Sequence, residues 1–357
     1  RRDGFTRILE KTSLPEDIAI GGYELAAVDM SGNTYECMLL EVCGAVEITS
    51  VEARLNDANK LSFWVGLKNV SDKNRNLRLN CFYDGKSLNS MDVAVPPFST
   101  KMVEMPVASF PYQGTAPEKL RFELQGEGGL QGVNERAFTL AQAERAIQRP
   151  QIDGRLDDWD NASWSRVFAG ESVTYQSKRH RGAKDFSVRY ALSSDENFLY
   201  LAFEVRDDVS HPSDNPQKPW LGDAVALVVG RDFDGNEEFK FCKYLMFALG
   251  SDGKAVVKQV LGTPPKGCFE LDSGEVDCAI RRDDVAGITI YEIAIPRKTY
   301  FGEGEINGIG MSVYDADTSS EVKDDVHRDI PLNGGVPLFM GNKIFSTLLF
   351  HSRGVQH

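Results

Sequence analysis

The chain has 357 residues, which at about 100–200 residues per domain predicts two domains. Lys and Arg number 40 against 53 Asp and Glu, so the net charge is −13. This balance argues against nucleic acid as the main partner and against an anionic membrane surface, because both need concentrated basic side chains. No apolar run is long enough for a membrane-spanning helix.

The N-terminus lacks the apolar core and small-residue cleavage site of a signal peptide. The chain also begins without Met. We interpret it as a mature product or a piece of a longer protein, with a trimmed chain as the alternative.

The first half of the chain predicts β-strands. In residues 60–71, apolar side chains recur at every second position, which is the pattern of a half-buried strand. Asp84-Gly85 separates two further runs and predicts a hairpin. Strands of this length with turns every 8–12 residues are typical of a sandwich. The spacing of turns in residues 69–107 resembles that of bacterial immunoglobulin-like and fibronectin-III-like modules, which implies such a sandwich for residues 20–145.

A glycine-rich break at residues 126–135 ends this series. The following stretch AQAERAIQ, residues 141–148, predicts a short helical linker that ends before Pro150. We therefore expect one domain over residues 1–145, including an N-terminal extension, and a second over residues 150–357.

The second half carries an ordered series of motifs. They are PQIDGRLDDWDNASW at 150–164, YALSSDENFLYLAFEVRDD at 190–208, PWLGDAVALVVG at 219–230, YLMFALGSDG at 244–253, YEIAIPRKTYFG at 291–302 and IGMSVYDAD at 309–317. In this order they resemble family 9 carbohydrate-binding modules and their DOMON-type relatives, over about 200 residues. The resemblance implies an antiparallel β-sandwich of jelly-roll type, so the whole chain is expected to be all-β, with two tandem sandwiches.

The resemblance also implies a sugar site between two tryptophans, since aromatic faces suit the C–H surfaces of sugars. Trp220 matches the first tryptophan, with a loop anchor as the alternative role. The polar contacts of the family fall on Ala226, Ala248 and Gly250, and residues 318–340 contain no second tryptophan. His327 is the one ring there before Phe339. Trp220 and His327 are therefore the candidate carbohydrate contacts, at a site expected to bind weakly.

Calcium is the second feature that the resemblance implies, because acidic loops supply oxygen ligands. The loop RDFDGNEE at 231–238 is interpreted as a turn, since its glycine stands too early for an EF-hand. The candidate ligands of a structural calcium are Asp153 and Asp208. Haem, bound by Met246 or Met311 with His327, is a weaker alternative, because methionines in strand patterns more often fill a core.

The six cysteines form no C-x-x-C pair and are interpreted as scattered buried thiols. A disulfide such as Cys268–Cys278 is the alternative in an exported protein. No G-x-S-x-G or H-E-x-x-H motif occurs. A carboxylate pair such as Asp315 with Glu204 is interpreted as solvated acid, so no catalytic residue is predicted.

The expected function is that of a non-catalytic accessory region of a larger secreted bacterial glycan-processing protein, at the cell surface or in the periplasm. Its partner would be a polysaccharide or oligosaccharide, or it would serve as a spacer. One alternative is the C-terminal part of a glycoside hydrolase whose catalytic domain precedes this chain. A second alternative is a purely structural or protein-interaction module.

Overall fold

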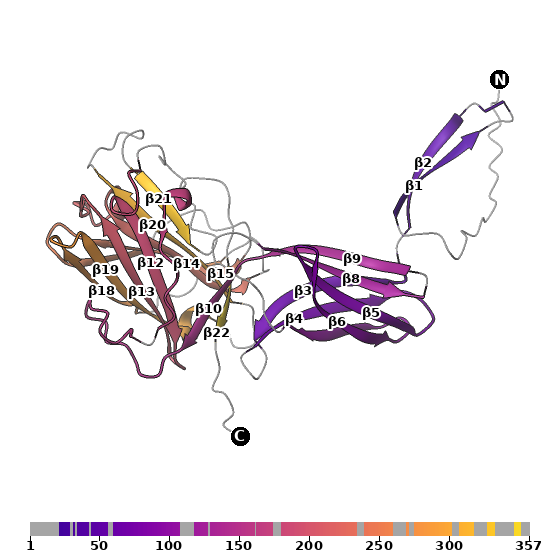
Figure 1. Ribbon diagram of the computed structural model, residues 1–357, viewed down its shortest axis with the longest axis horizontal. Helices are drawn as coiled ribbons and strands as arrows, with labels where there is room; N and C mark the ends of the chain where they lie inside the picture. Colours follow the sequence, from indigo (N-terminus) through magenta and orange to yellow (C-terminus); the bar gives the residue numbers. More distant parts are fainter. Residues whose placement is uncertain are drawn as a thin grey trace. The chain divides into compact units, whose positions relative to one another are not determined.

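The computed structural model describes residues 21–28, 31–32, 34–42, 44–55, 60–107, 118–127, 129–160, 162–173, 180–233, 239–259, 269–270, 275–301, 307–317, 327–332 and 346–350. Within these ranges the chain consists almost wholly of β-strands (Figure 1). The helical exceptions there are the single turn α1 (Arg297–Tyr300) and short 3-10 turns. The all-β prediction is therefore confirmed. None of the helices described could reach across a membrane.

The chain forms two compact units. The first comprises residues 1–51, 64–105 and 120–136, and the second comprises residues 52–63, 106–119 and 137–357. Strands β1 (Gly21–Val28) and β2 (Thr34–Val42) pair with each other as an antiparallel hairpin.

Seven further strands make a three-stranded sheet, β3-β4-β7, and a four-stranded sheet, β6-β5-β8-β9. Their bounds are β3 (Val46–Leu55), β4 (Leu61–Asn69), β5 (Arg75–Tyr83), β6 (Lys86–Val95), β7 (Thr100–Pro106), β8 (Glu118–Gly126) and β9 (Gly129–Phe138). Asp84 and Gly85 both have positive φ and join β5 to β6, as a type I′ hairpin turn requires, which confirms the predicted hairpin. The immunoglobulin-like assignment stays a prediction.

The second unit holds thirteen strands in one continuous sheet among the residues described, ordered β16-β15-β14-β20-β22-β10-β12-β13-β19-β18. Three short strands, β11, β17 and β21, pair with β12, β15 and β20. The bounds are β10 (Leu140–Arg145), β11 (Phe168–Ala169), β12 (Phe186–Ser194), β13 (Phe198–Asp207), β14 (Ala224–Phe233), β15 (Phe239–Leu249), β16 (Ala255–Gln259), β17 (Phe269–Glu270), β18 (Asp277–Asp283), β19 (Ile288–Pro296), β20 (Asn307–Ala316), β21 (His327–Leu332) and β22 (Ser346–Phe350).

This sheet folds around a single core. Strand β10 pairs in parallel with β22 on one side and with β12 on the other, so it links two halves. One cluster of buried side chains includes Leu227 and Met311 from the first half and Phe203 and Ile293 from the second half. The two halves therefore enclose one core in the manner of a sandwich. Strand β19 ends at Pro296, because proline has no N–H to donate to the ladder.

Two expectations are wrong. Residues 140–145 form β10 rather than a helical linker, because parallel pairing on both sides outweighs the weak helical preference of this short stretch. Cys278 is a free thiol, so a Cys268–Cys278 disulfide is not formed. Cys242 on β15 is disulfide-bonded, which the interpretation as scattered thiols missed.

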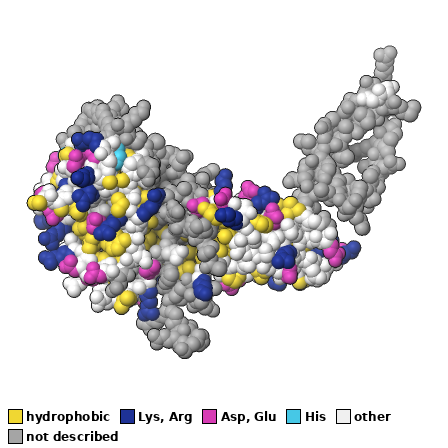
Figure 2. Space-filling view, viewed as in Figure 1, with side chains coloured by type: hydrophobic (Ala, Val, Ile, Leu, Met, Phe, Trp, Pro, Cys, Tyr) yellow, Lys and Arg dark blue, Asp and Glu magenta, His cyan; other side chains and the backbone are white. Residues whose placement is uncertain are grey.

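Basic and acidic side chains alternate over both units on the face that Figure 2 shows.

Candidate functional site

The opening motif at residues 150–164 forms hydrogen bonds to a buried glutamate, Glu292, and we call this arrangement the Glu292 clamp. Glu292 on β19 is fully buried, and its Oε2 accepts hydrogen bonds from the backbone N–H groups of Asp153, Gly154 and Arg155 at 3.0, 2.6 and 3.1 Å. Its Oε1 accepts a fourth bond, of 2.7 Å, from the indole Nε1–H of Trp159. Burial raises the pKa of Glu292 above its usual value, although these four donors oppose the shift by favouring the charged form.

Gly154 is required in this turn for two reasons. Its φ is +80°, and a Cβ at this position would lie 2.9 Å from the Cβ of Arg281. The carboxylate of the neighbouring Asp153 accepts a bond from the N–H of Arg155, as turn-forming aspartates do.

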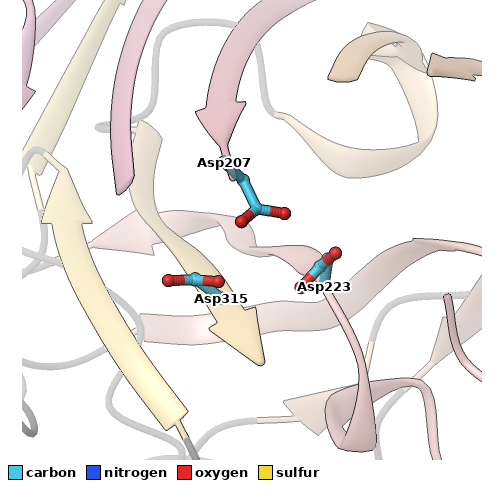
Figure 3. A group of neighbouring side chains, drawn as sticks. All are labelled: Asp207, Asp223 and Asp315. Atoms are coloured by element: carbon cyan, nitrogen blue, oxygen red, sulfur yellow. The ribbon is translucent and has the colours of Figure 1, made fainter. Parts of the chain in front are cut away.

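A group of three buried carboxylates lies where three strands meet (Figure 3). Asp207 ends β13, Asp223 directly precedes β14, and Asp315 lies near the end of β20. Their closest carboxylate oxygens all lie within 4.8 Å of one another. Asp208 and Asp317 form a second such group with Asp207, so five acidic side chains converge here.

Hydrogen bonds from the backbone hold this acidic group in place. Asp223 accepts one from the N–H of His211 at 2.6 Å and another from the N–H of Ala316 at 2.9 Å. Asp207 accepts one from the N–H of Val209 at 2.9 Å, and its Oδ2 lies 3.6 Å from the guanidinium of Arg282. The group thus connects the loop after β13 to the ends of β14 and β20.

Burial and the repulsion between neighbouring carboxylates make it unfavourable for several members of the acidic group to be ionised together. Burial raises the pKa of Asp207 to about 6, and the nearby charges of Asp317 and Asp208 add to this effect, while Arg282 opposes it. Burial and the charge of Asp207 raise the pKa of Asp223 well above its usual value. A proton or a cation therefore stabilises this group.

The residues fit a hard cation such as calcium, which prefers carboxylate oxygens. Asp207 Oδ2 is buried and has no hydrogen-bond partner among the residues described, so it offers a ligand position. The ligands would come from Asp207, Asp223 and Asp315, with Asp208 and Asp317 beside them.

The two predicted calcium ligands, Asp153 and Asp208, do not lie at one site. Asp208 lies in the second acidic group and pairs with Arg181 at 3.0 Å. Asp153 belongs to the Glu292 clamp and to neither acidic group. Sequence reasoning missed Asp223 because its signal, one aspartate directly before a strand, is common in turns. The loop at residues 234–238 lies outside the described residues.

Trp220 lies in the 3-10 turn η3 (Pro219–Leu221) and is half-buried. Together with Tyr244 it packs against a buried cluster on the outer face of β14, β15 and β20, which is the face opposite the main core. The cluster consists of Ala224, Ala226, Val228, Cys242, Met246, Ala248 and Tyr314. Asp223 follows Trp220 by three residues, so the acidic group holds the end of the Trp220 loop.

Gly222 allows this loop to pack closely. A Cβ there would lie 2.5 Å from the backbone oxygen of His211, which is closer than any side chain tolerates. The backbone N–H of Asp223 donates to the same oxygen at 2.9 Å. Backbone contacts on the C-terminal side of Trp220 therefore hold its loop against His211.

The other candidate residues lie on several strands of the second unit. His327 begins β21 opposite Ala316, and its side chain lies outside the described residues. Met246 and Met311 belong to different buried clusters on the two faces of the sheet, as core-filling methionines do, and haem binding with His327 stays a prediction. Glu204 pairs with Arg189 at 2.7 Å, whereas Asp315 lies in the acidic group.

Comparison with known proteins gives structural matches without sequence matches. No family model matches the chain, and no curated protein matches it. Among solved structures, a family 9 carbohydrate-binding module from Caldicellulosiruptor kristjanssonii in complex with glucose aligns at 18% identity and a TM-score of 0.40. The alignment covers 61% of this chain and 99% of that module.

Two further structures align similarly. A family 9 module from Caldicellulosiruptor kristjanssonii in complex with cellotriose matches at 17% identity and a TM-score of 0.37, over 60% of this chain and 97% of that module. A putative carbohydrate-binding protein from Bacteroides uniformis matches at 12% identity and a TM-score of 0.37, over 60% of this chain and 99% of that protein. The resemblance to family 9 modules is thus also found among solved structures, and at these values it assigns no ligand to this chain.

Proposed function

We propose that the second unit, which contains residues 150–357 and β10, is a non-catalytic module that binds a polysaccharide or oligosaccharide, with Trp220 as the aromatic platform. The observation that carries this proposal is the placement of Trp220. Its ring is half-buried on the outer face of the sheet, and backbone contacts at Gly222 and Asp223 hold its loop. A rigidly held aromatic face loses little entropy when a sugar ring stacks on it.

The acidic group would hold the loop that carries Trp220, through the hydrogen bonds of Asp223. A calcium ion held by Asp207, Asp223 and Asp315 would supply positive charge that offsets the repulsion between these carboxylates. The chain's own contribution is positional, because Asp223 joins the Trp220 loop to β20. His327 is the second proposed sugar contact.

The wider context that we propose is a larger secreted glycan-processing protein. The disulfide at Cys242 supports this context, since disulfides persist in oxidising compartments.

Affinity gel electrophoresis tests the proposal. The wild-type protein, Trp220→Ala and Trp164→Ala are run through gels that contain cellulose derivatives, xylan or β-glucan. Trp164 is the matched control, because it is also half-buried but lies against Trp159 and Arg189 on the opposite half. We expect retardation of wild type and Trp164→Ala in at least one polysaccharide, and free migration of Trp220→Ala. Equal mobility of wild type and Trp220→Ala in every gel contradicts the proposal.

A further inference from the structure

A cavity of about 290 Å³ lies beside β10 and β12, where the segment that follows β10 passes over them. None of its lining residues belongs to the Trp220 cluster or to the acidic group. Its volume is at the lower end of small-molecule pockets, which span about 300–1,000 Å³. It therefore has room for one compact molecule rather than for a chain that lies along the surface.

One wall of the cavity is apolar and firmly held. It is made by Trp159, Ala162 and Leu192. The hydrogen bond from Trp159 to Glu292 fixes the indole, and the backbone N–H of Ala162 donates to the carbonyl of Trp159 at 3.0 Å. This wall is preformed, so a ligand would not have to order it.

The polar lining contains groups without partners. Ser193 is only 8% exposed, yet its hydroxyl makes no hydrogen bond to any residue that the structure describes. Its oxygen is open to the cavity, where water or a ligand can form a hydrogen bond with it. The side chains of Arg145 and Gln148 also line the cavity and have no partner within the described ranges.

Two carboxylates in the lining each accept a hydrogen bond at only one of their two oxygens in the described part of the chain. Glu144 accepts one bond from the Ser163 hydroxyl at 2.6 Å, and Asp158 accepts one from the N–H of Gln151 at 2.7 Å. In the described part of the chain, the second oxygen of each carboxylate has no hydrogen bond. The cavity thus presents acceptors from two carboxylates, donors from Arg145 and Gln148, and a hydroxyl that does both.

We infer that this cavity is a second binding site, independent of Trp220, for one uncharged sugar residue. A sugar has hydroxyl groups around its edge that donate and accept hydrogen bonds, which match the polar lining. It also has an apolar C–H surface on its face, which matches the wall of Trp159, Ala162 and Leu192. An anionic ligand would face two carboxylates against one guanidinium, so the charge of the lining disfavours it.

Nuclear magnetic resonance titration tests this inference. D-Glucose, D-galactose, D-mannose and D-xylose are each added to the full chain, and the indole N–H signal of Trp159 is followed, assigned by its loss in Trp159→Phe. The variants are Ser193→Val, which removes the hydroxyl and suits a strand, and Ala162→Leu, which fills space. Ala286→Leu, on the exposed β18–β19 turn, is the control for an added side chain.

We expect at least one sugar to shift the Trp159 signal in wild type, in Ala286→Leu and in Trp220→Ala. We expect its dissociation constant to rise at least tenfold in Ser193→Val and Ala162→Leu. Loss of the shift in Trp220→Ala with retention in Ser193→Val would overturn the inference and leave the Trp220 proposal standing. The reverse pattern supports the cavity even if the Trp220 site fails. Absence of any shift in wild type overturns the inference.

Discussion

Single side chains of the second unit make stabilising contacts that their sequence motifs do not predict. Glu292 is the clearest case, because one buried carboxylate accepts four hydrogen bonds from the turn at residues 153–155 and from Trp159. The alternation of β19 predicts a strand, but the acceptor role depends on a segment about 140 residues earlier in the chain. The resemblance to carbohydrate-binding modules rests in part on this motif, but it does not explain why these residues are needed.

Replacing Glu292 by Leu should therefore destabilise the protein by more than about 3 kcal/mol. Each buried donor left without a partner costs about 1–3 kcal/mol. The donors at Gly154 and Trp159 are buried and those at Asp153 and Arg155 are partly buried, and all four lose their acceptor. Urea unfolding monitored by tryptophan fluorescence measures this loss. Glu204→Gln is the control, because its ion pair with Arg189 is partly exposed and should contribute less than about 1 kcal/mol. Similar stabilities for the two variants would show that the clamp is not needed.

At the scale of elements, the acidic group joins the ends of β13, β14 and β20. Sequence reasoning expected acidic loops to supply oxygen ligands and named Asp208 among them. It did not bring Asp223 to them, because strand pairing between β14 and β20 determines that contact. The loop motif is local, whereas the group is assembled by sheet topology.

The pKa of Asp207 leads to a prediction on pH. Its folded value of about 6 lies above the unfolded value of 3.8, so the folded state binds more protons between these values. In calcium-free buffer the unfolding free energy should therefore rise as pH falls from 7 to 4.5. The contribution of Asp207 is on the order of 3 kcal/mol at most. Thermal unfolding across this pH range measures it.

Asp207→Asn should lose the part of this pH dependence that Asp207 contributes, since an amide does not titrate, and the part due to Asp223 should remain. Calcium added to wild type at pH 7 should raise the melting temperature more than at pH 5, because protons compete for the same oxygens. A melting temperature that falls steadily from pH 7 to pH 4.5 without calcium would contradict the sign of the prediction.

At the scale of the whole molecule, β10 is the strand that completes the sheet of the second unit. It lies between β22 and β12 and brings together segments separated by about 150 residues. Its few residues carry no sequence signal of that role, since Ala, Gln, Glu and Arg favour a helix in isolation. The predicted start at residue 150 therefore leaves out a central strand.

A fragment of residues 150–357 should accordingly be much less stable than a fragment of residues 137–357. Without β10, the facing edges of β12 and β22 lose their backbone hydrogen bonds. Melting temperature and light scattering of the two fragments measure the difference. Equal melting temperatures would mean that β10 is dispensable and that the predicted boundary at residue 150 is the better one.

The sequence by itself determined the all-β class, the Asp84-Gly85 hairpin and the end of β19 at Pro296, because period-two patterns, turn residues and the missing N–H of proline act locally. Only the tertiary structure decided that residues 140–145 are a strand, that five carboxylates converge, and that Ser193 faces a cavity without a partner. Each of these depends on pairing or packing between segments far apart in the chain. A local pattern contains no information on which distant strand will lie beside it, so such sites appear only once the sheet is assembled.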